Sequence, residues 1–170
     1  MRISILIGNP NARGRTSHAA ELVARRAAEA VGAPEATLET VELADVASRL
    51  FERDDPGLAA LCAQVASADL LIVASPTYKA SFTGLLKAFL DRYGPRGLTG
   101  SVALPLMLGA SPAHALAVET QLRPVLLELG ASMPTRGLYL LDKQMEQLEA
   151  EVSAFMADAG PLLRRLLFPR

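Results

Sequence analysis

Short apolar runs alternate with segments of helical periodicity along this chain, and that alternation is the feature that most constrains its fold. Strands are predicted at Ile3–Ile7, Leu38–Leu43, Leu70–Ala74, Val102–Leu108 and Leu138–Leu141. Most of these runs lack a regular apolar/polar alternation, which is typical of strands covered on both faces. Only Leu38–Leu43 alternates as a half-exposed edge strand would. The order predicts a parallel sheet with helices on both faces.

The helical segments between these runs carry apolar residues at intervals of three and four. Helices are predicted at Thr16–Val31, Leu58–Val65, Phe82–Tyr93, Ala113–Leu129 and Leu148–Ala159, with Leu162–Phe168 as a further helical segment. Pro124 removes a backbone donor and presses on the carbonyl of Thr120, so we expect a kink or a local widening there. Gly160-Pro161 is expected to interrupt the last helix.

Charge and composition exclude several classes of protein. The 17 Lys and Arg residues nearly balance 18 Asp and Glu residues, which argues against a nucleic-acid partner. The hydrophobic fraction of 51% and the length of 170 residues favour a single folded domain spanning 1–170. Cys62 is the only cysteine, so a disulfide-built domain is excluded, and with two histidines a structural zinc site lacks ligands.

No targeting segment is evident, because the N-terminus runs directly into a strand too short for a signal-peptide core. Gly97–Val118 carries no charged residue but contains two prolines and three glycines, so a strand and loop are expected rather than a membrane span. We therefore expect a soluble cytoplasmic protein without a membrane partner. Cys62 lies on an apolar helical stripe, and we expect it to pack rather than react.

The loop after the first predicted strand, Gly8–Ser17, lies where a doubly wound sheet binds its ligands. A helix N-terminus offers unpaired N–H groups and partial positive charge, and so favours an anion. Thr16 and Ser17 add hydroxyls, and Arg13 and Arg15 add cations. The loop is therefore a candidate phosphate site, with a capped helix beside a solvated loop as the alternative.

Two common phosphate motifs do not match this loop. Five residues separate Gly8 from Gly14, and Arg15 stands where a Walker A loop requires lysine. The dinucleotide fingerprint also fails, because no glycine follows Gly8 by two positions. A nucleoside triphosphatase and a Rossmann dehydrogenase are both disfavoured, and a phosphate monoester remains.

A second loop follows the third predicted strand. Pro76 ends that strand and Ser81 can cap the next helix, which leaves Thr77–Ala80 as exposed backbone beside the first loop. The run Pro76-Thr77-Tyr78-Lys79-Ala80-Ser81-Phe82-Thr83-Gly84, followed by Leu85-Leu86-Lys87, resembles the NADPH-dependent FMN reductases of the flavodoxin-like superfamily. The resemblance is greatest to the reductases that serve alkanesulfonate monooxygenases, and it covers most of the chain up to about residue 140.

This resemblance implies a flavodoxin-like α/β fold, with five parallel strands in the order 2-1-3-4-5. It also implies that the first loop holds the FMN phosphate, that the second lies along the isoalloxazine ring, and that the turn after the fourth strand closes the site. Which of Arg13 and Arg15 meets the phosphate stays open, because Asn9 and Asn11 replace the serine and arginine common in relatives. The expected cofactor-binding residues are Asn9, Asn11, Arg13, Arg15, Thr16, Ser17, Pro76, Thr77, Tyr78, Lys79, Gly109, Ala110 and Ser111.

The function that the resemblance implies is hydride transfer from NADPH or NADH to FMN, with the reduced flavin supplied to a monooxygenase. The two cofactors carry that chemistry, so no catalytic side chain is expected; His114 is a weak candidate for substrate binding. The alternatives are a quinone or azo-dye reductase with tightly bound FMN, and a flavodoxin-type electron carrier. A homodimer or homotetramer is expected, because the helices at Phe82–Tyr93 and Leu116–Leu129 carry more apolar positions than one packed face requires.

Overall fold

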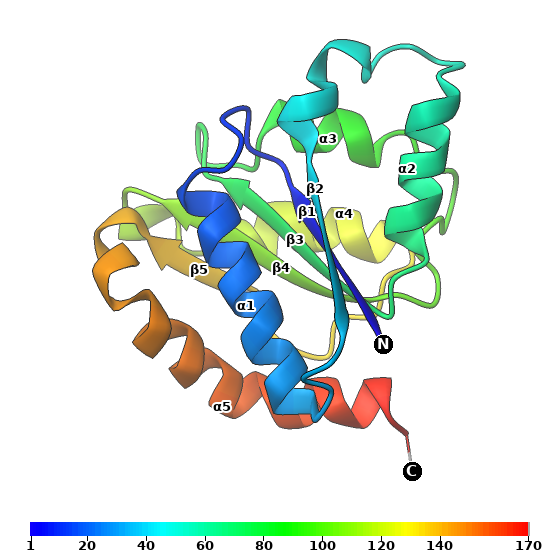
Figure 1. Cartoon of the computed structure of the whole chain (residues 1–170). Helices are drawn as coiled ribbons and strands as arrows, with labels where there is room; N and C mark the ends of the chain where they lie inside the picture. The colour runs from blue at the N-terminus through cyan, green and yellow to red at the C-terminus, as the bar shows by residue number, and fades with distance from the viewer. Residues whose placement is uncertain (170) are drawn as a thin grey trace.

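Five parallel strands form the centre of the protein, seen in the computed structural model of Figure 1, in which residues 1–169 are described. Their order is β2-β1-β3-β4-β5, as predicted. The strands are β1 (Arg2–Ile7), β2 (Thr37–Glu42), β3 (Leu70–Pro76), β4 (Val102–Gly109) and β5 (Leu138–Leu141). Parallel pairing brings all five carboxyl ends to one edge of the sheet, which is the edge where ligands bind in folds of this type.

Helices cover both faces of this sheet. The α-helices are α1 (Arg15–Val31), α2 (Pro56–Ala66), α3 (Gly84–Leu90), α4 (Arg123–Glu128) and α5 (Leu148–Leu167). Shorter helical segments are η1 (Leu43–Arg49), η2 (Pro112–His114), η3 (Val118–Leu122) and η4 (Asp142–Gln147). Helices α1 and α5 lie side by side on one face, and the hydrophobic core residues of α2, α3 and α4 all belong to the other face.

Alternating side chains of the central strands divide the core into two layers. In β1, Ile3, Ile5 and Ile7 pack toward α1 and α5, whereas Leu6 joins the layer beneath α2–α4. Strand β2 is buried only at Val41, as its alternating pattern predicted for an edge strand. The central strands β1, β3 and β4 are buried on both sides, so they fix the carboxyl edge on which the loops stand.

The segment around Pro124 is wider than an α-helix, as predicted. Residues 118–122 form a π-helical turn in which the Arg123 amide donates to the Val118 carbonyl. Because proline cannot donate a hydrogen bond, the regular pattern cannot run through this position. The single helix predicted at Ala113–Leu129 is wrong in extent, since η2, η3 and α4 divide that segment.

Two other helix predictions need correction. Thr83, and not Ser81, caps α3, because its side chain accepts a hydrogen bond from the Leu86 amide at 3.1 Å. The expected break at Gly160-Pro161 is also wrong, since α5 continues to Leu167. Pro161 is exposed, while buried residues before and after it anchor the helix to the core, and this packing outweighs the local cost of proline. No helix within residues 1–169 is long and apolar enough to cross a membrane.

Candidate functional site

The first loop of the site is fixed to the neighbouring strand and helix at its very beginning. The Gly8 amide donates to the Ala74 carbonyl at 2.8 Å, and the Thr83 hydroxyl donates to the Gly8 carbonyl. A Cβ atom on Gly8 would lie 2.5 Å from the Leu86 Cβ, so only glycine allows α3 to approach this closely. These contacts join the β1–α1 loop to the β3–α3 loop at the carboxyl edge of the sheet.

Asn9 organises the start of α1 from inside the loop. Its side chain is buried, donates through Nδ2 to the Thr16 hydroxyl at 3.1 Å and accepts the Asn11 amide at 3.0 Å. Through these two hydrogen bonds, Asn9 holds the loop against the first turn of α1. The side chain of Asn11 remains exposed above it.

The first turn of α1 has unused hydrogen-bond donors. The N-cap residue is Gly14, which has no side chain that could cap the helix. Within residues 1–169, no hydrogen bond uses the amides of Arg15, Thr16 or Ser17. The Ser17 hydroxyl is also buried without a hydrogen-bond partner. A buried hydroxyl without a partner is costly unless a ligand or water satisfies it, and together with the free amides of the helix N-terminus it makes a site for an anion.

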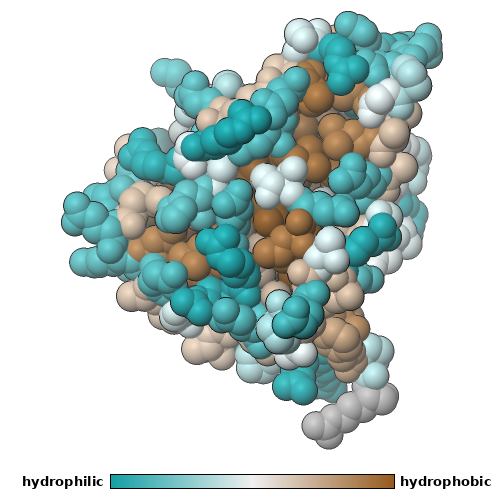
Figure 2. Space-filling view, in the orientation of Figure 1, coloured by the Kyte–Doolittle hydropathy of each residue, from teal (hydrophilic) through white to brown (hydrophobic). Residues whose placement is uncertain are grey.

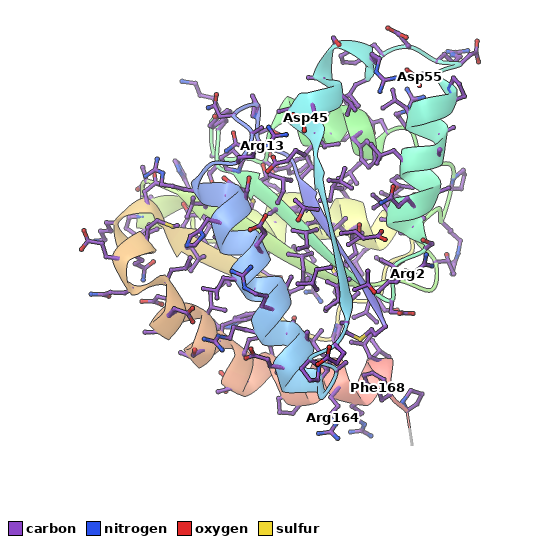
Figure 3. The ribbon with its side chains drawn as sticks, viewed as in Figure 1. Arg2, Arg13, Asp45, Asp55, Arg164 and Phe168 are labelled. Carbon is purple, nitrogen blue, oxygen red and sulfur yellow. The ribbon has the colours of Figure 1, made fainter. Side chains whose placement is uncertain are left out.

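The two arginines of the loop extend to opposite sides of it, and each meets a carboxylate. Arg13 has a left-handed backbone (φ 57°), and its guanidinium lies 2.7 Å from Asp45 of η1; both residues are labelled in Figure 3. Its amide donates to Glu42 at the end of β2. Arg15 lies 3.3 Å from Asp142, which directly follows β5. Both predicted cations therefore belong to the candidate anion loop, and each guanidinium is paired with a carboxylate.

The second loop makes a tight turn beside the first. Tyr78 and Ser81 exchange two backbone hydrogen bonds, of 2.8 and 3.1 Å, around Lys79 and Ala80. Both central residues have left-handed backbones, with φ of 51° and 64°, which is the geometry of a type I′ turn normally built from asparagine and glycine. Tyr78, Lys79 and Ala80 are exposed, as predicted, so the strained turn presents its backbone at the edge of the sheet. The prediction is wrong for Thr77, which is half-buried and donates its amide to the Leu108 carbonyl.

The third loop comes close to the second at Gly109. A Cβ atom on Gly109 would collide with the Tyr139 hydroxyl and lie 3.1 Å from the Thr77 hydroxyl. The Thr77 amide donates to the Leu108 carbonyl, but its hydroxyl is buried without a partner. Tyr139 donates to the Ser111 carbonyl at 2.8 Å and so fixes the turn that follows β4. The third loop thus comes close to the unsatisfied Thr77 hydroxyl of the second loop, in an approach that only glycine allows.

The remaining candidates occupy different positions. His114 is half-buried in η2, and its amide bonds to the Ser111 carbonyl, so it lies next to the third loop. Cys62 lies away from the loops in α2, where burial raises the pKa of its thiol above the usual range. A thiol with a raised pKa is a poor nucleophile, which agrees with the expected packing role. Among residues 1–169, no group of three or more His, Cys, Asp or Glu side chains is arranged to hold a metal ion.

Sequence reasoning missed several residues of this edge. Thr83 links α3 to the first loop, Tyr139 supports the third, and Asp45 and Asp142 pair with the two arginines. The sequence signal that could have identified these residues is their position, because each lies in or soon after a strand whose carboxyl end is at this edge of the sheet. Their roles depend on contacts across 28 to 127 positions of sequence, which local patterns do not encode.

The three loops fit the parts of an FMN molecule. The free amides and the Ser17 hydroxyl can satisfy a terminal phosphate, and the same loop carries the cations Arg13 and Arg15. The exposed Tyr78–Ser81 turn and the buried Thr77 hydroxyl offer polar groups for the edge of a ring. An anion site for the tail and a few fixed polar groups for the ring are what a flavin nucleotide requires.

Comparisons with known proteins agree with this interpretation. Residues 1–146 match the family model for NADPH-dependent FMN reductases. An FMN reductase (NADPH) of Escherichia coli is 37% identical over 148 residues, which cover 85% of this chain and 75% of that protein.

Two solved structures share the whole fold. The apo form of an NADH:FMN oxidoreductase, EMOB, has a TM-score of 0.77 and 32% identity, covering 99% of this chain and 96% of that one. An oxidoreductase from Corynebacterium diphtheriae has a TM-score of 0.86 and 25% identity, covering 100% of this chain and 98% of that one. The chain therefore belongs to the NADPH-dependent FMN reductase family.

Proposed function

We propose that this protein reduces FMN with NADPH or NADH at the carboxyl edge of its sheet, and that the reduced FMN serves a flavin-dependent monooxygenase. The observation that carries the proposal is the set of unsatisfied groups gathered there: three free amides at the start of α1 and the buried hydroxyls of Ser17 and Thr77. Family membership supports the same chemistry.

The proposal divides the work between the cofactors and the chain. Bound FMN accepts the hydride that the nicotinamide supplies, so the redox chemistry belongs to the cofactors. The first loop holds the phosphate through Asn9, Asn11, Arg13 or Arg15, Thr16 and Ser17. The second and third loops orient the ring through Pro76, Thr77, Tyr78, Lys79, Gly109, Ala110 and Ser111. We assign no acid or base, because orientation and exclusion of water are sufficient for hydride transfer between two bound cofactors.

The proposal includes both NADPH and NADH as coenzymes. The family description and the relative from Escherichia coli name NADPH, whereas the EMOB structure names NADH. His114 remains a proposed contact for the nicotinamide nucleotide, since it is half-buried next to the third loop. The single domain spanning 1–170 and the cytoplasmic location also remain predictions.

Anaerobic addition of NADPH to the protein mixed with FMN tests the reductase activity. We expect the flavin absorbance near 450 nm to disappear on the order of seconds. A parallel sample with NADH compares the two coenzymes. A protein that binds FMN but bleaches with neither coenzyme would be an electron carrier, and the proposal would be wrong.

The amount of FMN reduced distinguishes the proposal from its nearest alternative. With a large excess of FMN over protein, an enzyme that uses FMN as a substrate reduces the whole pool. A quinone or azo-dye reductase with tightly bound FMN reduces only one equivalent per site until an acceptor is added. Bleaching that stops at one equivalent would therefore contradict delivery of reduced FMN to a separate monooxygenase.

A further inference from the structure

The two loop arginines differ in how firmly their carboxylates hold them. The Arg13 guanidinium makes two contacts with Asp45, at 2.7 and 3.3 Å, and its amide is bonded to Glu42. Both arginine side chains are largely exposed, but Arg15 makes only a single contact with Asp142, at 3.3 Å. Arg15 is therefore the arginine that can change partner with less disruption of the loop.

Asp142 is held in a defined place opposite the first turn of α1. It directly follows Leu141, the last residue of β5, and its side chain is two-thirds buried. The Leu141 amide donates to the Gln144 side chain at 2.8 Å, and Gln144 donates in turn to Glu151 of α5 at 2.8 Å. These bonds fix the segment that carries Asp142, so the carboxylate stays beside Arg15.

Arg15 also belongs to the turn whose free amides form the candidate phosphate site. A carboxylate and a phosphate both prefer the same guanidinium donors. While Arg15 is paired with Asp142, an incoming phosphate must either displace the carboxylate or bind without the full use of this cation. The phosphate carries more negative charge than the carboxylate, so it can displace Asp142 from Arg15. The free energy lost with the Arg15–Asp142 pair then reduces the net binding free energy of the phosphate.

We propose that Asp142 competes with the FMN phosphate for Arg15 and so weakens the affinity of the protein for FMN. This inference rests on the proposed function of the loop as the phosphate site. Its consequence is an FMN that exchanges readily, as a substrate must, rather than one that stays bound between turnovers. Asp142 is thus an affinity-setting residue that acts through Arg15, and it takes no part in hydride transfer.

Binding of FMN and riboflavin to the unmodified protein and to Asp142→Asn tests the inference. The ion pair is partly exposed, so its removal is expected to tighten FMN binding about 1.4- to 5-fold, which corresponds to about 0.2–1 kcal/mol. Riboflavin has no phosphate, and its affinity should stay unchanged. Thermal unfolding of the apo-protein shows whether the variant is folded, and little change is expected for a partly exposed pair.

Asp45→Asn is the matched control, because it removes the partner of the other loop arginine by the same substitution. FMN affinity should not change in this variant, since Glu42 still holds the Arg13 backbone. The second control is Arg15→Gln, alone and combined with Asp142→Asn. The tightening caused by Asp142→Asn should disappear in the Arg15→Gln background, because the competition requires that guanidinium.

The outcomes separate the inference from the function on which it rests. Tightening that persists without Arg15 would mean that Asp142 simply repels the phosphate, and tightening by Asp45→Asn alone would assign the role to Arg13; either result overturns the inference. So does an unchanged FMN affinity in Asp142→Asn, when the unmodified protein binds FMN better than riboflavin. Equal affinities for the two flavins in the unmodified protein would instead remove the phosphate site itself.

Discussion

The Ser17 hydroxyl is the clearest single-residue sign that α1 begins at a ligand site. It is buried and has no hydrogen-bond partner among residues 1–169. A buried unsatisfied hydroxyl costs about 1–3 kcal/mol, whereas a hydrogen bond to a charged group returns about 1.5–3 kcal/mol. The residue therefore reduces the stability of the empty protein and is compensated when an anion binds.

Ser17→Ala separates these two effects. We expect the melting temperature of the apo-protein to stay unchanged or to rise, because the unsatisfied group is gone. FMN affinity should fall about 10-fold, the equivalent of about 1.4 kcal/mol, while riboflavin affinity stays the same. Calorimetric titration with the two flavins and a thermal scan measure all three quantities.

Thr16→Ala is the neighbouring control. Its hydroxyl accepts the Asn9 side chain at 3.1 Å, so this variant should lower the melting temperature of the apo-protein as well as FMN affinity. A Ser17→Ala variant that loses apo stability and keeps its FMN affinity would show that the serine only packs.

Asp55 gives a residue-scale prediction about pH. Its carboxylate accepts the Leu58 amide at 2.9 Å and lies 2.8 Å from Arg49, and the hydrogen bond from the Leu58 amide is the largest of the effects that lower its pKa. A pKa that is lower in the folded than in the unfolded state stabilises the protein at pH values above the unfolded pKa of about 3.9. That stabilisation is lost as the pH falls through the folded value.

Asp55→Asn keeps an oxygen that can cap α2 but removes the titration. The difference in unfolding free energy between the unmodified protein and this variant should therefore be largest at neutral pH and should close below about pH 4. Urea unfolding at pH 7, 5 and 3 measures it. A difference that does not vary with pH would show that the charge of Asp55 has no part in stabilising the helix.

At the scale of elements, the Tyr78–Ser81 turn carries backbone strain. Each left-handed residue other than glycine costs about 1–2 kcal/mol, and both Lys79 and Ala80 are left-handed. Ala80→Gly should relieve one of these costs, partly offset by the greater freedom of glycine in the unfolded chain. We expect the melting temperature to rise by about 2 °C, as a gain of up to about 1 kcal/mol gives in a domain of this size.

The control for Ala80→Gly is Ala60→Gly, which makes the same substitution at an exposed residue of α2 with ordinary helical geometry. It should lower stability by about 1 kcal/mol, because glycine is a poor helix former. If Ala80→Gly destabilises the protein as much as this control does, the turn is not strained in solution.

Elements also show how far the sequence could predict this structure. The strands and their order followed from apolar runs and from the family resemblance, because burial on two faces leaves a strong local pattern. The break at Pro161 was wrong, since packing of the residues on either side of it against the core is a tertiary effect. Choosing Ser81 over Thr83 as the cap failed for a related reason: both can cap a helix, and only the contact with Gly8 distinguishes them.

The candidate site likewise divides into features that local sequence patterns predict and features that depend on tertiary contacts. The loops that approach a ligand were found from glycine, proline and hydroxyl residues at the ends of strands. The residues that support those loops were not, because Tyr139 and Asp142 act through neighbours in space. The left-handed backbones of Arg13, Lys79 and Ala80 were also unpredictable, since none of these residue types favours that geometry.

At the scale of the whole molecule, exposed hydrophobic residues are the feature that calls for explanation. Figure 2 shows a largely hydrophilic outline, with hydrophobic residues visible around β2 and toward α2. The two helical regions expected to meet a partner differ from each other. Phe89 and Leu90 of α3 are fully buried within the monomer, whereas Leu116 and Leu127 are 71% and 52% exposed.

The region from η2 to α4 is therefore the part of the prediction that still points to an oligomer. Leu116 precedes the π-helical turn and Leu127 lies in α4, on the chain segment that follows the third loop of the site. Contact with a second copy of the chain would cover both of these apolar side chains. Closed dimers are the commonest form of self-association, and a tetramer can be built from them.

Light scattering at micromolar concentration should give a mass at least twice the monomer's 18.0 kDa. Changing Leu116 and Leu127 together to Glu should shift the mass to that of the monomer, because a buried contact would then contain unpaired charges. Leu166→Glu is the control, since Leu166 is 44% exposed in α5 on the opposite face of the sheet. A monomer mass for the unmodified protein would contradict self-association, and dissociation by Leu166→Glu alone would move the interface to α5.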